Sequence, residues 1–173
     1  MSFSSLGLSE QLVRATADQG YETPSPIQAK AIPAVLSGRD VMAAAQTGTG
    51  KTAAFILPIL HRLSNKAASR KVRALIIVPT RELAAQIRQA TIDLGKNTGV
   101  RSLSIYGGVS KVRQLAELRR GAEVVVACPG RLLDHINAGG IDLSGVDVLV
   151  LDEADTMCDM GFLPEIRRIL SHL

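Results

Sequence analysis

Short apolar runs alternate along the chain with longer segments of helical periodicity. The short runs are apolar at consecutive positions, which is typical of strands buried on both faces of a parallel sheet. The predicted strands are 40–45, 74–78, 100–106, 123–127 and 146–151. The predicted helices lie near 26–36, 50–63, 81–95, 110–119, 130–138 and 163–171. This alternation predicts an α/β fold, a doubly wound and mainly parallel sheet with helices on both faces.

The chemically unusual residues follow the ends of predicted strands, where open α/β sheets bind their ligands. Residues 64–71 are polar and basic without periodicity, so we predict a surface loop there. No repeat, low-complexity tract or linker interrupts the pattern. The 173 residues therefore predict one domain, residues 1–173, that is long enough to bury a sizeable core.

Composition changes this picture little. Aromatic residues make up only 3% of the chain, so the core must be aliphatic. A net charge of +4 suits a nucleic-acid surface, but it also suits an ordinary soluble protein. Cys128 and Cys158 lack metal-ligand spacing, and we expect both to be buried and reduced. The start MSFSSLGLSE resembles no signal peptide, and we expect a cytoplasmic protein that contacts no membrane.

A phosphate-binding loop follows the first predicted strand. Residues 45–52 read AQTGTGKT and lead into a helical pattern. Small residues let successive backbone N–H groups turn toward phosphate oxygens at a helix N-terminus. Lys51 is expected to reach the β- and γ-phosphates, and the Thr52 hydroxyl to bind Mg²⁺. The other predicted nucleotide contacts of the loop are Gln46, Thr47, Gly48, Thr49 and Gly50.

A second motif supplies the acidic groups that such a loop requires. The apolar run 148–151 ends in Asp152 and Glu153. Asp152 is expected to hold Mg²⁺ as a Walker B aspartate does, and Glu153 to orient the attacking water. Alternatively, the two carboxylates begin a helix, where its dipole favours negative charge. Lys51, Asp152 and Glu153 are therefore the candidate catalytic residues.

Residues 152–155 spell DEAD, and with the phosphate loop the chain resembles the DEAD-box ATP-dependent RNA helicases. The motif sequences and their spacing most resemble those of the bacterial RhlE-type subgroup. Further family motifs follow in order: PTRELA at 79–84, GG at 107–108, PGR at 129–131 and GF at 161–162. The resemblance implies a RecA-like P-loop NTPase domain that uses ATP and Mg²⁺. It divides the chain into a Q-motif region, residues 1–38, and a P-loop core, residues 39–173.

Residues 20–28, GYETPSPIQ, resemble the family's Q motif. By this resemblance Gln28 contacts adenine and Tyr21 packs on the base, with Phe3 supporting the pocket. Thr23 and Pro26 complete the predicted adenine-binding residues. A glutamine amide offers an acceptor beside donors, which matches the N6 amine and N7 acceptor of adenine.

A helix capping box is the other reading of the same stretch. Ser25 precedes Gln28 by three residues, just before an apolar run. A capping glutamine turns back to the backbone N–H of Ser25, whereas a base reader must offer its amide to adenine. The sequence leaves both roles open for Gln28.

The resemblance also implies an RNA-binding face on loops at strand ends. Hydroxyl, guanidinium and helix-start N–H groups there are suited to phosphates. One departure is Cys128, where the family usually has threonine; a thiol is a weak donor, so one contact to phosphate is expected to be weakened. We expect RNA binding without strong sequence preference. The predicted contacts are Pro79, Thr80, Arg81, Gly108, Pro129, Gly130 and Arg131.

Members of this family have two RecA-like domains, and the second supplies an arginine finger. The sequence ends at Leu173, before that domain, so we expect half of a helicase core. We also expect the protein to be a monomer. We expect it to bind adenine nucleotide weakly, hydrolyse it slowly and unwind no duplex alone. Two alternatives are a nucleotide-gated RNA-binding scaffold and another P-loop helicase-type ATPase. The intact catalytic residues argue against the first, and the Q motif argues against the second.

Overall fold

The structure, a computed structural model, describes residues 1–46 and 48–173. These residues form two compact units. The first contains Met1–Ala68 and Ala90–Val100, and the second contains Ser69–Gln89 and Arg101–Leu173. The predicted nucleotide contact at Thr47 lies outside the described residues.

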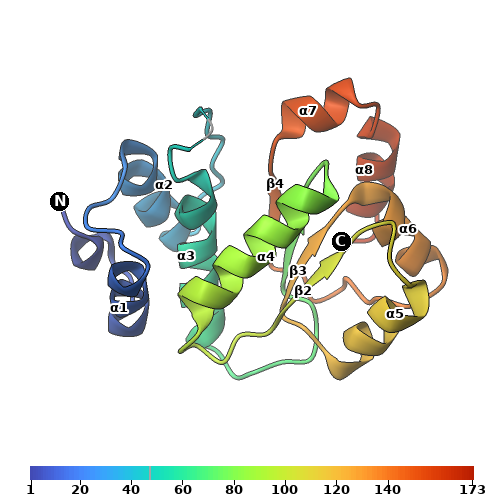
Figure 1. Ribbon diagram of the computed structural model, residues 1–173, viewed down its shortest axis with the longest axis horizontal. Coiled ribbons are helices and arrows are strands. Elements are labelled where there is room, and N and C mark those ends of the chain that lie inside the picture. Colours follow the sequence, from blue (N-terminus) through green and yellow to red (C-terminus); the bar gives the residue numbers. More distant parts are fainter. Residues whose placement is uncertain (47) are drawn as a thin grey trace. The chain divides into compact units, whose positions relative to one another are not determined.

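The first unit is helical. It contains the 3₁₀ helix η1 (Phe3–Leu6) and the helices α1 (Glu10–Asp18), α2 (Pro26–Leu36) and α3 (Lys51–Ser64). Helices α2 and α3 pack against each other (Figure 1). The largest fully buried side chains here are Leu12, Ile32, Ile56, Leu57, Ile59 and Leu60. The helix predicted at 26–36 is confirmed at both ends, and the one predicted at 50–63 within one residue.

The second unit contains a fully parallel sheet of four strands in the order β2-β3-β1-β4. The strands are β1 (Ala74–Ile77), β2 (Ser102–Ile105), β3 (Val124–Ala127) and β4 (Val148–Leu151). Every residue of β1 and β3 is buried, as their consecutive apolar residues predict. These four predicted strands and the α/β fold class are confirmed.

Four helices belong wholly to this second unit: α5 (Lys111–Arg120), α6 (Pro129–Asn137), α7 (Ala154–Asp159) and α8 (Leu163–Leu170). One core cluster joins alternate residues of three strands, Leu75, Leu103 and Val125 among them, to α6, α7 and α8. Helix α4 (Arg81–Gly95) follows β1, and its residues divide between the two units after Gln89. Among the residues described, no helix is both long and apolar enough to cross a membrane.

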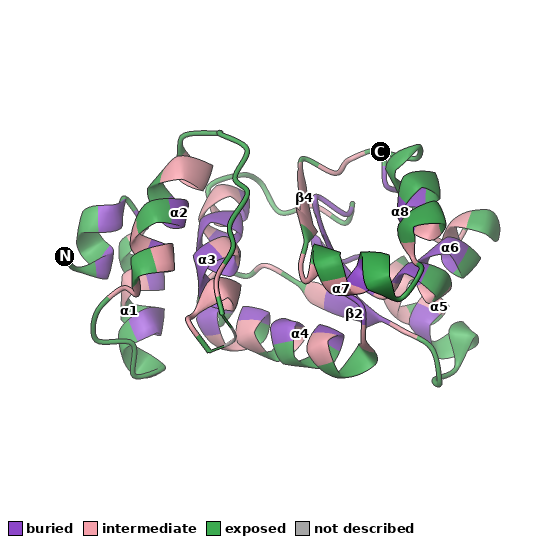
Figure 2. Cartoon of the chain, turned by 90° about the horizontal axis from the view of Figure 1, so that it is seen from above, coloured by how far each residue is buried: buried purple, intermediate pink, exposed green. Residues whose placement is uncertain are grey.

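The strand predicted at 40–45 is wrong. Residues 40–46 form no strand, and Met42 is 102% exposed. Figure 2 shows the segment after α2 mostly in green, the colour of exposed residues. Three of the six predicted residues are alanines, which favour strands weakly and bury little apolar area. An apolar run alone therefore does not show that a neighbouring strand is present to pair with its backbone.

The expectation of two buried thiols is also wrong. Cys158 is exposed and Cys128 is only half-buried, although both are free thiols as predicted. Cys158 lies on the short helix α7, whose inward position is taken by Met157. The surface loop predicted at 64–71 is confirmed for residues 65–71, which form no helix or strand and are mostly exposed, whereas Ser64 is the last residue of α3.

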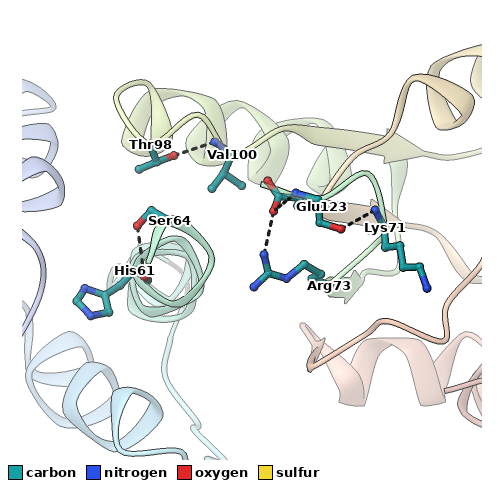
Figure 3. A network of polar contacts seen from close by, with 8 residues as sticks. His61, Ser64, Lys71, Arg73, Thr98, Val100 and Glu123 are labelled. Carbon is teal, nitrogen blue, oxygen red and sulfur yellow. Dashed lines mark hydrogen bonds and ion pairs between the residues drawn. The ribbon is translucent and has the colours of Figure 1, made fainter. Parts of the chain in front are cut away.

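A buried ion pair lies at the start of two central strands. Arg73 Nη1 is 3.0 Å from Glu123 Oε1, and both side chains are almost fully buried (Figure 3). Arg73 precedes β1 and Glu123 precedes β3, and the backbone N–H of Arg73 donates to the carbonyl of Glu123 at 2.9 Å. Glu123 Oε1 also accepts from the backbone N–H of Ser69, at 3.3 Å. The pair thus joins the surface loop to the sheet.

We predict that Glu123→Leu lowers the free energy of unfolding by about 3–5 kcal/mol, because it leaves the Arg73 cation buried without its carboxylate. The double variant Arg73→Met/Glu123→Leu should be more stable than Glu123→Leu alone, since it removes both charges. Urea denaturation of Glu123→Leu, Arg73→Met and the double variant measures this. Purely additive losses would contradict the assigned coupling.

Candidate functional site

The position of Tyr21 is fixed by how α1 ends. Gly20 has φ +76°, and its N–H donates to the carbonyl of Ala17 at 2.9 Å. The N–H of Tyr21 donates to the carbonyl of Thr16 at 2.9 Å, so the turn is a Schellman motif that favours glycine. The Tyr21 ring lies 6.3 Å from the buried ring of Phe3, centroid to centroid, and remains 38% exposed. An exposed, supported ring is suited to stacking on a planar base.

Gln28 is the central residue of the candidate nucleotide site. It lies in the first turn of α2 and is only 2% exposed. Its Oε1 accepts from the backbone N–H of Ser25 at 2.9 Å, and the Gln28 N–H donates to Ser25 Oγ at 3.5 Å, completing the capping box. Its Nε2 donates to the carbonyl of Gly50 at 3.1 Å. One amide thus joins the start of α2 to the end of the phosphate loop.

The contact with Gln28 explains the glycine at position 50. Gly50 has φ +85° and is the N-cap of α3. A Cβ at this position would collide with Gln28 Nε2. The Gly50 carbonyl also accepts the first helical hydrogen bond, from the N–H of Ala54 at 3.2 Å. Both the backbone conformation and the space beside Gln28 therefore require glycine here.

The other described residues of the phosphate loop lie at or just before the start of α3. Lys51 and Thr52 are its first two residues and are half-buried. Thr49 Oγ1 donates to the carbonyl of Gln46 at 2.7 Å, which closes the loop on itself. Among the other predicted contacts, Gly48, Thr23 and Pro26 are exposed. The structure thus brings Gln28 to the loop and leaves Tyr21, Thr23 and Pro26 accessible.

The parallel sheet collects the other predicted residues at one edge of the second unit. In the strand register, Ile105, Ala127, Ile77 and Leu151 stand side by side as the last residues of their strands. The segments that follow these strands, loops and the first turns of α4 and α6, carry Gly108, Pro129–Arg131, Thr80–Arg81 and Asp152–Glu153. Sheet topology therefore explains why the motifs fall at strand ends along the sequence.

Thr80 and Arg81 lie where β1 gives way to α4, just after the buried Pro79. Thr80 Oγ1 accepts from the N–H of Leu83 at 3.3 Å and so caps the helix. Arg81 Nε donates to Glu82 Oε1 at 2.9 Å; this hydrogen bond raises the pKa of Arg81 and lowers the pKa of Glu82. The loop at residues 106–109, which contains Gly107 and Gly108, is called the glycine loop. Arg81 Nη1 lies beside it, 3.2 Å from where a Cβ on Gly108 would stand.

The start of α6 carries the PGR motif. Pro129 is buried and Gly130 is exposed, and Cys128 is the N-cap without a side-chain hydrogen bond. Burial, with a smaller effect of the Glu82 charge, raises the pKa of the Cys128 thiol to about 11. The thiol is therefore neutral at pH 7 and does not repel an anion. Arg131 Nη1 donates to the carbonyl of Val109 at 2.8 Å and to Gln114 Oε1 at 3.0 Å.

The DEAD sequence begins directly after β4. Asp152 is half-buried, and its N–H donates to the carbonyl of Ile77 at 3.0 Å. Glu153 has φ +53° and is the only non-glycine residue with positive φ among those described. This conformation costs about 1–2 kcal/mol for a residue with a Cβ. Strain of this kind is concentrated at functional sites, which supports a special role for Glu153.

Comparison with known proteins identifies the family. A family model described as DEAD/DEAH box helicase matches residues 25–173. The chain is 49% identical over 172 residues to the DEAD-box ATP-dependent RNA helicase RhpA of Helicobacter pylori, covering 99% of this chain and 34% of that protein. It is 50% identical over 171 residues to the ATP-dependent RNA helicase DeaD of Mycobacterium tuberculosis, covering 98% and 30%.

Solved structures of DEAD box proteins are also similar to this chain. The crystal structure of a DEAD box protein from Methanococcus jannaschii matches with a TM-score of 0.92 at 38% identity, over 99% of this chain and 47% of that one. The likeness confirms the predicted RecA-like fold. The chain spans about a third of the length of these curated relatives and about half of the solved protein.

We predict that Cys128→Thr raises the free energy of unfolding by about 1 kcal/mol, because threonine accepts from the free N–H groups at the start of α6 whereas the thiol makes no cap. Urea denaturation measures the change. Cys128→Val is the matched control, since valine has the shape of threonine without its hydroxyl. Equal stability of the two variants would contradict the capping explanation.

Proposed function

The chain belongs to the DEAD/DEAH box helicase family, and from this premise we propose that it is the ATP-binding domain of an ATP-dependent RNA helicase. The observation that carries this proposal is the bridge between Gln28 and the carbonyl of Gly50, which joins a base reader to a phosphate loop. In the full-length protein the domain would couple ATP hydrolysis to RNA binding and local unwinding of a duplex.

We propose that adenine is bound from the side of α2. Tyr21 stacks on the base, with Thr23 and Pro26 at its edge. Gln28 pairs with the N6 amine and N7 when its amide exchanges one of its present bonds for the base. Guanine has an acceptor in place of that amine, so we expect ATP to be preferred over GTP.

The phosphates would be held at the start of α3. Backbone N–H groups of the loop surround them, and Lys51 neutralises the β- and γ-phosphates. Thr52 and Asp152 supply hard oxygen donors, the ligands that Mg²⁺ prefers, so their chemistry fits this ion. Bound Mg²⁺ supplies charge neutralisation at the phosphates. Glu153, held in its unusual backbone conformation, would orient the attacking water.

We propose that RNA binds along the edge where the strands of the second unit end. Thr80 and Arg81 would contact phosphates, and Gly108, which lies beside Arg81 Nη1 and carries no side chain, would let the RNA backbone approach this guanidinium closely. Pro129, Gly130 and Arg131 present the start of α6, where backbone N–H groups favour a phosphate. These groups address the RNA backbone rather than base edges, so we expect little sequence preference.

We further propose that residues 1–173 act as one RecA-like domain, with the Q-motif region at 1–38 and the P-loop core at 39–173. A second RecA-like domain would complete the helicase and supply an arginine finger. Placement in the RhlE-type subgroup, a monomeric state and a cytoplasmic location are part of the same proposal. Two free thiols fit a reducing compartment.

The test is ATP turnover by the full-length protein, with and without single-stranded RNA, and by residues 1–173 alone. We predict turnover that RNA stimulates in the full-length protein, and a rate lower by roughly 10³-fold or more in the isolated domain, which lacks the arginine finger. Glu153→Gln should reduce turnover by about a hundredfold or more while ATP still binds.

The alternatives give different results. Equal turnover with RNA, with DNA and with neither would favour another P-loop ATPase. ATP-dependent RNA binding without turnover would favour a scaffold. Strong RNA-stimulated turnover by residues 1–173 alone would contradict the proposed need for a second domain.

A further inference from the structure

Gln114 is a buried glutamine on α5 to which the sequence assigns no role. It is 5% exposed, and three polar groups surround its amide. Gln114 Nε2 donates to the carbonyl of Tyr106 at 3.0 Å. Gln114 Oε1 accepts from Arg131 Nη1 at 3.0 Å, and His135 Nε2 lies 3.1 Å from the same oxygen. All of these residues belong to the second unit.

The orientation of this amide has one solution. A backbone carbonyl only accepts, so the NH₂ group must face Tyr106. A guanidinium only donates, so the oxygen must face Arg131. His135 must then donate from Nε2 to that oxygen. Burial and the Arg131 and Lys111 charges lower the pKa of His135, and the Asp134 charge opposes them. The lowered pKa favours the neutral ring.

The two outer bonds of this network hold the glycine loop at both ends. Gln114 binds the carbonyl of Tyr106, just before Gly107, and Arg131 binds the carbonyl of Val109, just after Gly108. The bond between Gln114 and Arg131 joins the two anchors. Helices α5 and α6 thus fix the ends of a four-residue segment, 106–109, whose own glycines do little to restrict the backbone.

The same network fixes Arg131. Its side chain is 13% exposed, and Nη1 is fully used by Val109 and Gln114. Its Nε is 3.7 Å from Asp134 Oδ2, which also pairs with Lys111 at 3.1 Å. Among the described residues, none accepts a hydrogen bond from Arg131 Nη2. That nitrogen is the part of the guanidinium left to meet a phosphate.

We propose that Gln114 is a positioning residue for RNA binding: it sets the glycine loop and the Arg131 guanidinium in place before RNA arrives. The inference rests on the proposed RNA-binding function of this edge. Gln114 itself is buried and touches no RNA. It acts because a loop and a side chain already ordered lose less conformational entropy on binding.

The test uses the full-length protein and a single-stranded oligouridine as the RNA probe. Gln114→Met keeps the length and burial of the side chain but removes both polar ends. We predict an increase of about tenfold in the RNA concentration needed for half-maximal ATPase stimulation, with kcat at saturating RNA and KM for ATP unchanged. Gln11→Met, on α1 in the first unit, is the matched control and should change none of these values.

A merely structural role predicts a different pattern. If Gln114→Met only unfolds part of the protein, turnover at saturating RNA falls and the RNA requirement stays the same, which would overturn the proposal. Gln114→Glu provides a second variant, because it keeps an acceptor for Arg131 but sets an oxygen against the Tyr106 carbonyl. We predict that it also raises the RNA requirement; a value equal to wild type in both variants would overturn the proposal.

A double-variant cycle tests whether Gln114 acts through Arg131. In an Arg131→Met background, adding Gln114→Met should weaken RNA binding by far less than in wild type. Fully additive losses would overturn the positioning role. Failure of wild type to bind RNA would overturn the proposed function and this inference together, whereas RNA binding that no Gln114 substitution alters would overturn this inference alone.

Discussion

The proposed nucleotide site depends on the amide of Gln28. It satisfies the backbone N–H of Ser25 at the start of α2 and the carbonyl of Gly50 at the start of α3, both inside a buried contact. An unpaired buried polar group costs about 1–3 kcal/mol, so neither bond is given up without a replacement. In the proposed complex, the adenine amine and N7 would present the same pair of hydrogen-bonding roles to the amide, which has a second N–H and a second lone pair beside those used in the protein. Under the proposed function, capping and base reading are therefore compatible roles of one side chain.

The proposed RNA-binding edge depends on parallel strands in register. Because β2, β3, β1 and β4 end level with one another, residues from loops far apart in the sequence meet at one edge of the sheet. Some of their polar groups already form caps and ion pairs, as Thr80 and Arg81 show. The protein's own hydrogen bonds therefore order part of this surface without a ligand.

The sequence predicted those parts of the fold whose signals are local. Consecutive valines and isoleucines predicted β1 and β3, and Ser25, in a capping-box pattern, predicted the start of α2. The strand prediction at 40–45 is wrong because apolar character alone does not show that another strand pairs with this segment. Helix α1 was not predicted, since its nine residues bury only Leu12, Ala15 and Thr16.

The site residues divide in the same way. Glycines, Lys51 and the DEAD carboxylates form short motifs that the sequence shows directly. Gln114 does not, because its partners lie 8, 17 and 21 positions away and any polar helical residue looks the same. The bond from Gln28 to Gly50 spans 22 positions and was equally invisible. Long-range polar contacts have no pattern of their own along the chain.

The most direct measurement of the central claim compares ATP and GTP binding by Gln28→Glu and wild type. Glutamate still accepts from the Ser25 N–H, but it donates neither to Gly50 nor to adenine. The account predicts that ATP binds at least about tenfold more weakly and that the preference for ATP over GTP disappears. Unchanged ATP affinity, or equal weakening of both nucleotides with the preference intact, would show that Gln28 does not read the base.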